Sequence, residues 1–520
     1  MKEVLILKYL YENRRSYIKF LGINLITGIL IYLTLISQQL TNHFDGLWSD
    51  SFYMAGYWEI SIGRWFWPVL DQLRLGYAAD PYNSYLTIFF FAVGNLLITD
   101  MFSMCKGGKT YFINIMIFSS TTISAFLSYR YMSPTFGLSY LLSVCAVWNL
   151  YKKHSWSNWL FASIAVCLSL GLYQANLGCA CFLVNVLVML LCLVEDDNKS
   201  ILIFIIRTGS SIAVACISYK ILWNLVMKFF RVSASSYNGA ANVSVSLIIK
   251  RLPVQILAAY SKFYTYFFEN IYKHSIFQTT YIYKIIFLLL LLVLLWQGYM
   301  LLQKKKWLRL IIYLSGIIIL PITCNISVLL APEAGFLIQQ TCAMAIFIPV
   351  MFCLLDKKFR DVKNYNWLKR VVLGIGFLIL YGNIYMTAID LEAMYEGKNA
   401  SENVMNHVVQ TLINKGLYNG EKQYFFVGRI SNNPLFKTTK FWKDANTYAR
   451  YGEFWLDISC VHMAYDGILH DMGIGMLIGD DNVCRDYISN GIMEDMPVYP
   501  ESGSIMDMGE YVLVKISNVY

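Results

Sequence analysis

Charged residues are scarce in this chain, and their scarcity excludes most classes of soluble protein. Asp, Glu, Lys and Arg make up 14% of the 520 residues, whereas apolar residues make up 57%, and the mean hydropathy is +0.49. Soluble domains of that combined size need more polar surface than this composition supplies. The chain is therefore predicted to use lipid as its solvent.

Motifs that bind nucleotides or metal ions are also absent. The sequence has no Walker A loop, no kinase signature, no His-Glu-x-x-His motif and no Gly-x-Ser-x-Gly nucleophile elbow, so nothing indicates ATP or nucleotide-sugar binding in the cytoplasm. Gly479-Asp480-Asp481 is a lone acidic pair, which is more typical of a turn than of a metal site. No repeat of about 20 to 50 residues and no inverted duplication is present, which counts against a transporter built from repeats.

The twelve cysteines do not have the spacing of a metal site. Most of them lie inside apolar runs, where a free thiol behaves as a small hydrophobic group. Cys460 and Cys484 lie in the more polar C-terminal part of the chain. They can form a disulfide if that part is exported, and two free thiols agree with the sequence equally well.

Long apolar runs are what the chain has in abundance. A helix needs about 20 apolar residues to cross the bilayer core, and about 17 to 25 are tolerated. The first run is too long for a signal-peptide core and lacks a small-residue cleavage site, so we expect a transmembrane helix there. Runs of roughly the required length lie at 18–37, 85–104, 111–128, 157–174, 176–194, 201–223, 284–302, 308–330, 336–355 and 368–389, and a shorter run at 136–151 brings the predicted total to about eleven helices.

The positive charges predict the topology, because Lys and Arg in short loops are retained in the cytoplasm. With a cytoplasmic N-terminus every predicted cytoplasmic segment is basic, and this agreement requires the odd helix count, including the short helix. The net charge of +9 does not indicate a nucleic-acid binder, since the cations form no continuous face. The predicted cytoplasmic cations are Arg14, Arg15, Lys106, Lys109, Lys152, Lys153, Lys199, Lys304, Lys305, Lys306, Arg309, Lys357, Lys358, Arg360, Lys369 and Arg370.

The predicted fold is an all-α polytopic transmembrane domain followed by a small α/β domain outside the cytoplasm. The first comprises residues 1–389, with external loops at 38–84 and 231–283, and the second comprises residues 390–520. The C-terminal part has ordinary polarity and a strand-like run at 423–427. A final hairpin is predicted through Val498 to Ile516, around the turn Glu501-Ser502-Gly503-Ser504.

The first external loop combines acidic and aromatic residues, and it carries the candidate catalytic groups. Its acids include Asp45, Asp50 and Glu59, and Trp and Tyr are interleaved with them. Such a segment can lie in the membrane interface with its rings toward lipid and its carboxylates toward water. A carboxylate held there can act as general base on a hydroxyl delivered from the aqueous side, whereas the alternative is a solvated loop without a catalytic role.

Cations in the external loops are candidates for binding a phosphate. They are unusual there, because positive charge near helix ends favours the cytoplasmic side. The alternative is contact with anionic lipid headgroups. The planar fork of the arginine guanidinium matches phosphate oxygens, so we rank Arg64 and Arg130 above the lysines. The candidates are Arg64, Arg130, Lys250 and Arg251.

Three further polar residues at predicted outer helix ends are candidates for lining a sugar pocket. Glu333 lies in Ala331-Pro332-Glu333-Ala334, and Tyr173-Gln174 mark another outer turn. Sugars are held by polar side chains against aromatic faces, which these residues can supply. As polar groups at helix ends they also need no such role. Inside the runs, Asp100 lies near a predicted cytoplasmic end, where it can reach the aqueous phase.

Several short motifs resemble one family of membrane enzymes, the polytopic Gtr-type glucosyltransferases of the wider GT-C class. The resemblance spans most of the chain. Its motifs are Asn42-His43-Phe44-Asp45-Gly46-Leu47-Trp48, Trp58-Glu59-Ile60-Ser61-Ile62-Gly63-Arg64-Trp65, Ser169-Leu170-Gly171-Leu172-Tyr173-Gln174-Ala175, Met496-Pro497-Val498-Tyr499-Pro500-Glu501-Ser502-Gly503-Ser504-Ile505 and Tyr511-Val512-Leu513-Val514-Lys515. Enzymes of this family add glucosyl branches to bacterial O-antigen.

The resemblance implies a hexosyltransferase of the bacterial cytoplasmic membrane. It implies a sugar donor linked to polyprenyl phosphate, a cell-surface polysaccharide as acceptor, and no nucleic-acid partner. It requires no cofactor and allows a divalent cation. Similar enzymes place the general base in the first external loop, often as an adjacent acidic pair. Here Asp45 and Asp50 are separated, and we rank Asp45 first, Asp50 second and Glu59 third as the base.

The implied mechanism is a single displacement with inversion at the anomeric carbon. Asp45 takes the proton of the acceptor hydroxyl, and Arg64 or Arg130 stabilises the departing phosphate. Two other interpretations stay open at this point. One is a lipid-linked saccharide flippase or other transporter, which predicts charges deep in the helices. The other is a GT-C transferase for another sugar, or a polymer ligase, because epimers differ in a single hydroxyl.

The predicted topology can be tested by fusing a phosphatase after Tyr520. We expect the fused enzyme to be active, because an odd number of helices starting from the cytoplasm places the C-terminus outside. Phosphatase activity in intact cells is the measurement. A fused phosphatase that is found only in the cytoplasm would remove one helix from the predicted count.

Overall fold

The computed structural model describes most of the chain. It omits the start of the chain, residues 42–53 of the first external loop, several connections and a segment near residue 455. The described residues are 4–41, 54–73, 75–76, 80–104, 108–152, 154–195, 197–237, 245–269, 279–329, 335, 337–359, 366–436, 440–449 and 462–518.

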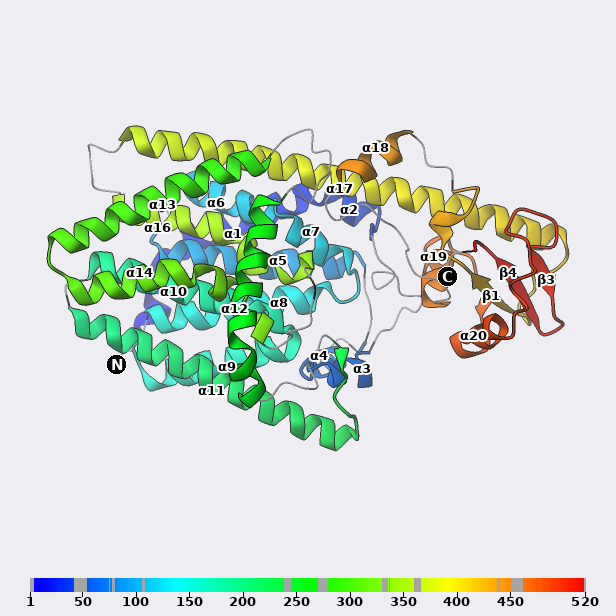
Figure 1. Ribbon diagram of the computed structural model, residues 1–520, viewed down its shortest axis with the longest axis horizontal. Coiled ribbons are helices and arrows are strands. Elements are labelled where there is room, and N and C mark those ends of the chain that lie inside the picture. The colour runs from blue at the N-terminus through cyan, green and yellow to red at the C-terminus, as the bar shows by residue number, and fades with distance from the viewer. Residues whose placement is uncertain are drawn as a thin grey trace.

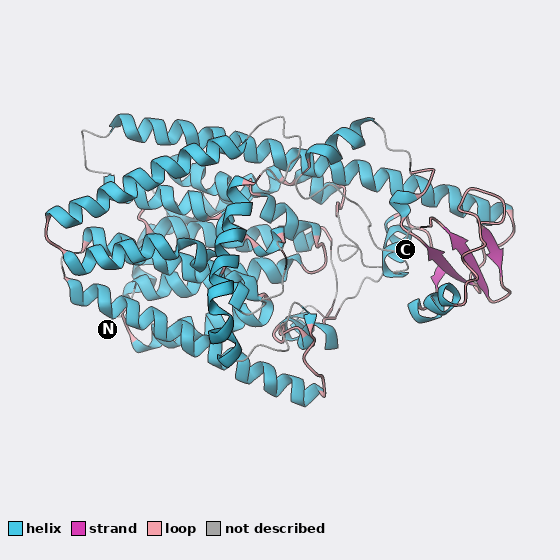
Figure 2. Ribbon diagram, viewed as in Figure 1, coloured by secondary structure: helices cyan, strands magenta, loops and turns pink. Residues whose placement is uncertain are grey.

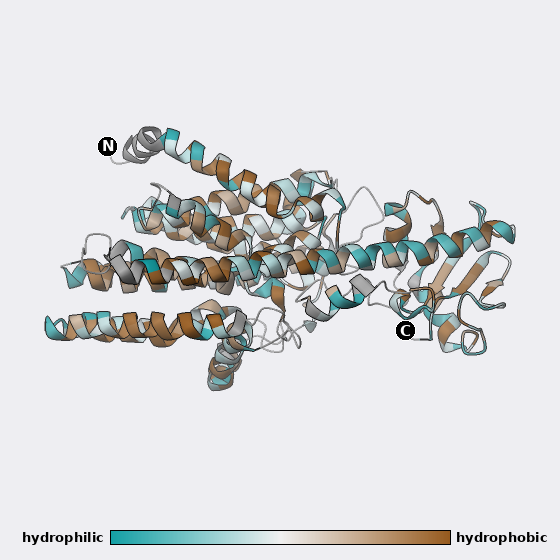
Figure 3. Cartoon of the chain, turned by 90° about the horizontal axis from the view of Figure 1, so that it is seen from above, coloured by the Kyte–Doolittle hydropathy of each residue, from teal (hydrophilic) through white to brown (hydrophobic). Residues whose placement is uncertain are grey.

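Long helices lie side by side in a bundle that makes up most of the molecule (Figure 1). The hydropathy colouring of Figure 3 shows hydrophobic residues concentrated along these helices. The N-terminal half of the bundle contains α1 (Val4–Ile31), α2 (Leu33–Ser37), α5 (Tyr82–Met101), α6 (Gly108–Phe118), α7 (Thr121–Ser128), α8 (Ser133–Lys152), α9 (Trp156–Leu172), α10 (Leu177–Val194) and α11 (Asn198–Phe230). The remaining helices of this part are α12 (Val245–Phe268), α13 (Thr279–Gln303), α14 (Trp307–Cys324), α15 (Cys342–Ala345), α16 (Phe347–Phe359) and the first half of α17 (Asn366–Asn414).

Six helices of the described residues are long and apolar enough to cross a membrane. The number rises to seven if the bent pair α6 and α7 is one span. Each of the predicted apolar runs overlaps a helix, and the short run at 136–151 lies within the 20-residue helix α8. Several of these helices, α9 and α16 among them, are shorter than a full span. The helical membrane architecture is thus confirmed, whereas the count of about eleven spans stays a prediction.

The run at 111–128 is two helices rather than the one that we predicted. Helices α6 and α7 meet at an angle of 53°. Ser120 caps α7 by accepting a hydrogen bond from the Thr122 N–H, and the Tyr32 hydroxyl donates to the carbonyls of Phe118 and Ser120. These contacts satisfy backbone groups that a break would otherwise leave without partners in an apolar interior.

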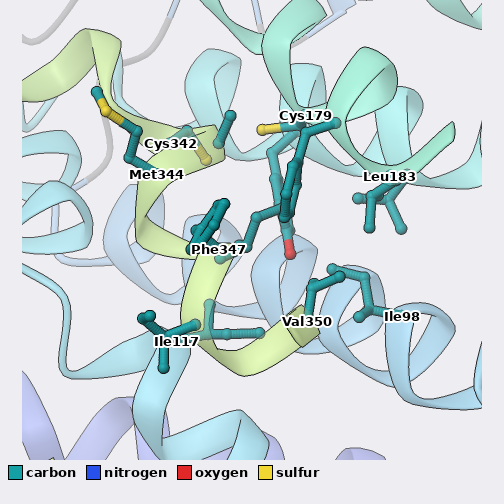
Figure 4. Close-up of a cluster of buried hydrophobic side chains, with 14 of the residues drawn as sticks. Ile98, Ile117, Cys179, Leu183, Cys342, Met344, Phe347 and Val350 are labelled. Atoms are coloured by element: carbon teal, nitrogen blue, oxygen red, sulfur yellow. The ribbon is translucent and has the colours of Figure 1, made fainter. Parts of the chain in front are cut away.

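The interior of the bundle is packed with aliphatic, aromatic and sulfur-containing side chains. Figure 4 shows Cys179 and Cys342 near one another above Phe347, with Leu183 and Val350 to the right. All of these side chains are buried. The predicted behaviour of the cysteines in the apolar runs as small hydrophobic groups agrees with this packing.

Asp100 does not reach the aqueous phase, as its position suggested, but is buried and paired. Its carboxylate accepts hydrogen bonds from the Tyr17 hydroxyl and the Trp148 indole N–H, each at 2.7 Å. The Lys152 ammonium lies 3.0 Å from it. The three partners come from α1 and α8, so this carboxylate ties both helices to the end of α5.

Helix α17 continues for 49 residues, from the bundle into the C-terminal part of the chain. The boundary that we predicted between residues 389 and 390 therefore falls inside a helix. The outer part of α17 contributes Ala400, Val404, Val408 and Leu412 to the hydrophobic core of the C-terminal part. This part and the bundle share one continuous helix, which appears in yellow in Figure 1.

The C-terminal part contains a four-stranded sheet of order β2-β1-β4-β3, and Figure 2 shows that the strands lie at that end of the molecule. Strand β1 is parallel to both of its neighbours, and β3 and β4 are antiparallel. The strands are β1 (Gln423–Val427), β2 (Leu477–Ile478), β3 (Ile505–Asp507) and β4 (Tyr511–Lys515), and the helices are α18 (Lys440–Tyr448), α19 (His462–Asp471) and α20 (Asp481–Ser489).

The strand predicted at Gln423–Val427 is confirmed, but the final hairpin turns at a different place. The connection between β3 and β4 lies at residues 508–510, not at 501–504 as we predicted. Gly509 adopts a φ of +88° there, and its N–H donates to the Asp507 carboxylate. The predicted turn around Gly503 is a separate bend that precedes β3, since the Ser504 N–H donates to the Glu501 carbonyl.

Candidate functional site

The described part of the first external loop is held against the bundle by long polar side chains. This part contains α3 (Tyr57–Ser61) and α4 (Trp67–Leu73). The Gln174 amide, in the turn after α9, donates to the Ile62 carbonyl at 2.8 Å. The Trp223 indole of α11 donates to the Ile60 carbonyl at 2.7 Å. Gln174, a candidate for lining a sugar pocket, is thus engaged in positioning the loop.

Gly63 allows the loop to lie close to α11. Its φ is +90°, a conformation that is unfavourable for residues with a Cβ. A Cβ on Gly63 would also lie 2.2 Å from the Tyr219 hydroxyl oxygen. That hydroxyl donates to the Gly63 carbonyl at 3.1 Å. Gly63 is therefore needed for this turn, and the turn fixes the backbone position of Arg64.

Two buried carboxylates bind the backbone just after the acidic segment that carries Asp45 and Asp50. The Glu59 carboxylate accepts the Gly56 N–H at 2.7 Å, and the Asp71 carboxylate accepts the Ala55 N–H at 2.7 Å. Both acids are buried, Asp71 almost completely. Glu59, our third choice as base, thus forms the N-terminal cap of α3.

Arg64 is the cation of this loop that has no carboxylate partner among the described residues. Its guanidinium carbon lies 5.3 Å from the centre of the Tyr173 ring and 5.8 Å from that of Trp67. The side chain is half-buried, and its Nε has no hydrogen-bond partner in that same part of the chain. Aromatic faces orient the guanidinium and leave its N–H groups available to an anion.

Tyr173 provides the buried wall behind Arg64. Its ring packs edge-to-face against Phe136 at 4.7 Å and against Phe126 at 5.9 Å between ring centres. The residue is buried. We predicted that Tyr173 lines a sugar pocket, and the structure places it beneath the Arg64 guanidinium, so any sugar contact is made beside that cation.

Arg130 differs from Arg64 because carboxylates surround it. Its Nε donates to Asp80 at 2.8 Å, and its two terminal nitrogens donate to the Asp471 carboxylate at 2.7 and 3.2 Å. One of them also donates to the Gln39 side chain at 3.3 Å. The fork that makes arginine suitable for a phosphate is occupied by protein groups here. Of the two arginines, Arg64 is therefore the one whose guanidinium no carboxylate of the described residues occupies.

Lys250 and Arg251 belong to a different element, the first turns of α12. Figure 1 shows α12 running across the neighbouring helices rather than along them. Lys250 is exposed, and so are the apolar side chains of Ile249, Val254 and Leu257. An exposed apolar face next to cations is typical of a helix at the membrane interface. The lipid-headgroup interpretation of these two cations therefore stays open beside the phosphate one.

Three predicted site residues lie outside the described residues, namely Asp45, Asp50 and Glu333. The sequence analysis did not single out Asp71. Among the acids of the first loop that the structure describes, Asp71 is the most deeply buried. The acid-rich composition of the loop was the available signal, but it does not distinguish an acid that binds backbone from one that binds substrate.

The site thus combines a half-buried arginine that aromatic rings orient, a buried tyrosine wall and a loop anchored at several points. A comparison with known families adds to this geometry. A family model described as Glucosyl transferase GtrII matches residues 38–355. The matched range contains the first external loop, Arg64 and Tyr173, and it ends within α16, before α17 and the C-terminal sheet. No curated protein and no solved structure matches the chain.

The anchoring of the first loop predicts the effect of replacing Asp71. In the Asp71→Ala variant the Ala55 N–H loses its buried acceptor, so the segment after the candidate base becomes looser. We expect hydrogen exchange of the amides of residues 54–59 to be about tenfold faster, as the loss of one buried hydrogen bond implies. The control is Gln72→Ala, an exposed position on the same helix. Equal exchange rates in both variants would show that Asp71 does not hold this segment.

Proposed function

The chain belongs to the GtrII glucosyl transferase family, and we propose that it transfers a hexose, glucose in keeping with the family, from a polyprenyl-phosphate carrier to a cell-surface glycan. The site lies in the first external loop of a bacterial cytoplasmic membrane protein, on the extracytoplasmic side. The observation that carries the proposal is Arg64, an arginine held over two aromatic rings without a carboxylate partner in the described chain.

The geometry around Arg64 fits a phosphate whose lipid tail remains in the bilayer. A carboxylate partner would compete with the phosphate, and none pairs with Arg64 among the described residues. The faces of Tyr173 and Trp67 keep the guanidinium in place before the donor binds, so less side-chain entropy is lost on binding. The apolar helices beside the loop supply the surroundings that a polyprenyl chain needs.

The reaction is a single displacement at the anomeric carbon. The acceptor hydroxyl oxygen forms a bond to that carbon while the bond from the carbon to the phosphate oxygen breaks. The electron pair of the broken bond leaves with the phosphate, and the hydroxyl proton passes to the base. Asp45 is our first choice for the base and Asp50 our second. Glu59 ranks last, because its carboxylate already accepts the Gly56 N–H.

Arg64 stabilises the negative charge that develops on the departing phosphate. The same charge exists in part in the ground state, so Arg64 contributes both to donor binding and to the rate. A divalent cation is an optional second counter-charge, and the proposal needs none. The C-terminal part of the chain, built on the outer half of α17, contributes to binding the acceptor.

The choice of base can be tested with purified protein in lipid, labelled polyprenyl-phosphate sugars and a polysaccharide acceptor. We expect Asp45→Asn to reduce the transfer rate by at least about 100-fold, because the amide cannot take the proton. Asp50→Asn is the matched variant, and it should retain most of the activity. Transfer that survives in Asp45→Asn and disappears in Asp50→Asn reverses the assignment, and activity in both means that these acids are not the base.

The role of Arg64 can be tested by Arg64→Lys, which keeps the charge and removes the planar fork. We expect a donor KM about tenfold higher and a lower kcat, while the acceptor KM changes little, because only the phosphate contacts are altered. The control is Arg231→Lys, the same change at an exposed position after α11. A donor KM that is equal in both variants would remove Arg64 from the phosphate site.

A further inference from the structure

A buried cluster of charges lies where the C-terminal part meets the bundle. Arg130, between α7 and α8, is at its centre and pairs with Asp80 and Asp471. The side chains of these three residues are 11%, 13% and 5% exposed, respectively. Burial alone would lower the pKa of the Arg130 guanidinium, but the two carboxylates outweigh burial and raise the pKa above its usual value. The Arg130 guanidinium therefore stays charged at the centre of the cluster.

A second cation extends the cluster along α17. The Lys398 ammonium lies 3.9 Å from the Asp471 carboxylate and 3.7 Å from that of Glu402. It also donates to the Gln38 carbonyl at 2.8 Å. The cluster thus joins the end of α2, the segment before α5, the loop after α7, helix α17 and the end of α19.

Asp471 is the member of this cluster that comes from the C-terminal part. It is the last residue of α19, which lies on the side of that part facing the bundle (Figure 1). The two oxygens of its carboxylate accept hydrogen bonds from the two terminal nitrogens of Arg130. A bidentate pair fixes the direction as well as the distance between the two groups, which a single contact or a lysine does not.

The rest of α19 packs against the C-terminal sheet, so a contact at the end of α19 orients the whole C-terminal part. Ala464, Tyr465, Ile468 and Leu469 of α19 belong to the same hydrophobic core as β1, β4 and the outer half of α17. The Tyr465 hydroxyl also donates to the Gly428 carbonyl at the end of β1. The C-terminal part is therefore attached to the bundle by α17 on one side and by the Arg130 cluster on the other.

We propose that Arg130 is a positioning residue, which seats the C-terminal part on the outer end of the bundle and thereby places the acceptor glycan relative to the first external loop. This inference rests on the proposed function for the identity of the acceptor. The cluster sets the orientation of the C-terminal part, and Arg130 does not touch the donor phosphate. Asp80 joins the same cluster just before α5, so the end of the first loop and the C-terminal part are oriented together.

The experiment uses the full-length protein in lipid and the variant Asp471→Asn, which keeps the shape of the side chain and removes its charge. Two quantities are measured, namely hydrogen exchange in α19 and the KM values for acceptor and donor. We expect about tenfold faster exchange in α19 and an acceptor KM about tenfold higher, with the donor KM within about twofold of the parent value.

A conservative variant distinguishes positioning from a general loss of structure. In Asp471→Glu the carboxylate is kept, so its ion pairs with Arg130 and Lys398 can still form. We expect Asp471→Glu to retain most of the exchange protection and acceptor KM that Asp471→Asn loses. The control is Asp507→Asn, which removes the Lys422 ion pair inside the same part, away from the cluster.

The possible results separate the inference from the proposed function. Unchanged exchange in α19 for Asp471→Asn, or an Asp471→Glu variant as impaired as Asp471→Asn, would overturn the inference. A donor KM that rises as much as the acceptor KM would also overturn it, because Arg130 would then belong to the phosphate site. If the parent protein transfers no hexose, the proposed function fails, whereas the exchange measurements still decide whether the cluster seats the C-terminal part.

Discussion

The structure depends on the rule that backbone polar groups without helical partners must find partners in an apolar environment. At two places where the chain leaves a regular helix, side chains from elsewhere in the bundle donate hydrogen bonds to the backbone carbonyls. Tyr32 does so at the break between α6 and α7, and Gln174 and Trp223 do so beside α3. The described part of the first external loop is held against the bundle, because side chains of the bundle donate to the carbonyls of Ile60 and Ile62.

The charges of the chain fall into two groups with different consequences. Asp100 and Arg130 are buried, and each is surrounded by partners of opposite charge or by hydrogen-bond donors or acceptors. Lys515 is also buried, and its ammonium donates to the carbonyls of Met493 and Met496. Removing one partner from such a group costs about 3 to 5 kcal/mol, because an uncompensated buried charge remains, so the fold requires these partners and the charges are not available to substrate. Arg64 belongs to the other group, since aromatic rings orient its guanidinium.

The sequence predicts those features that depend on local composition. Every apolar run overlaps a helix, and the strand at Gln423–Val427 has the predicted bounds. The break at Ser119-Ser120 was missed although Ser119 to Thr122 interrupt the apolar run, because short hydroxyl side chains also occur inside membrane helices. Tyr32 and Thr387, far away in the chain, make the break favourable. The continuation of α17 past residue 390 was missed for a similar reason, since polarity changes there while helix propensity does not.

The candidate site was predicted less completely than the fold. Composition pointed to the first loop, but the roles of Glu59, Gln174 and Arg130 depend on partners that lie outside their local sequence. Asp471 is 341 positions away from Arg130, and no local pattern connects the two. A sequence therefore distinguishes an external arginine from a cytoplasmic one, but it does not distinguish an arginine that is already paired from one that is available.

The uninterrupted helix α17 gives the molecule a mechanical property. At about 1.5 Å per residue its 49 residues extend over about 74 Å, more than twice the roughly 30 Å thickness of the hydrocarbon core. A change in helix tilt of about 10° displaces a point about 40 Å beyond its pivot by about 7 Å, and tilt is the usual response to a change in bilayer thickness. This displacement is mainly parallel to the membrane surface, so the tilt of α17 sets the lateral position of the sheet.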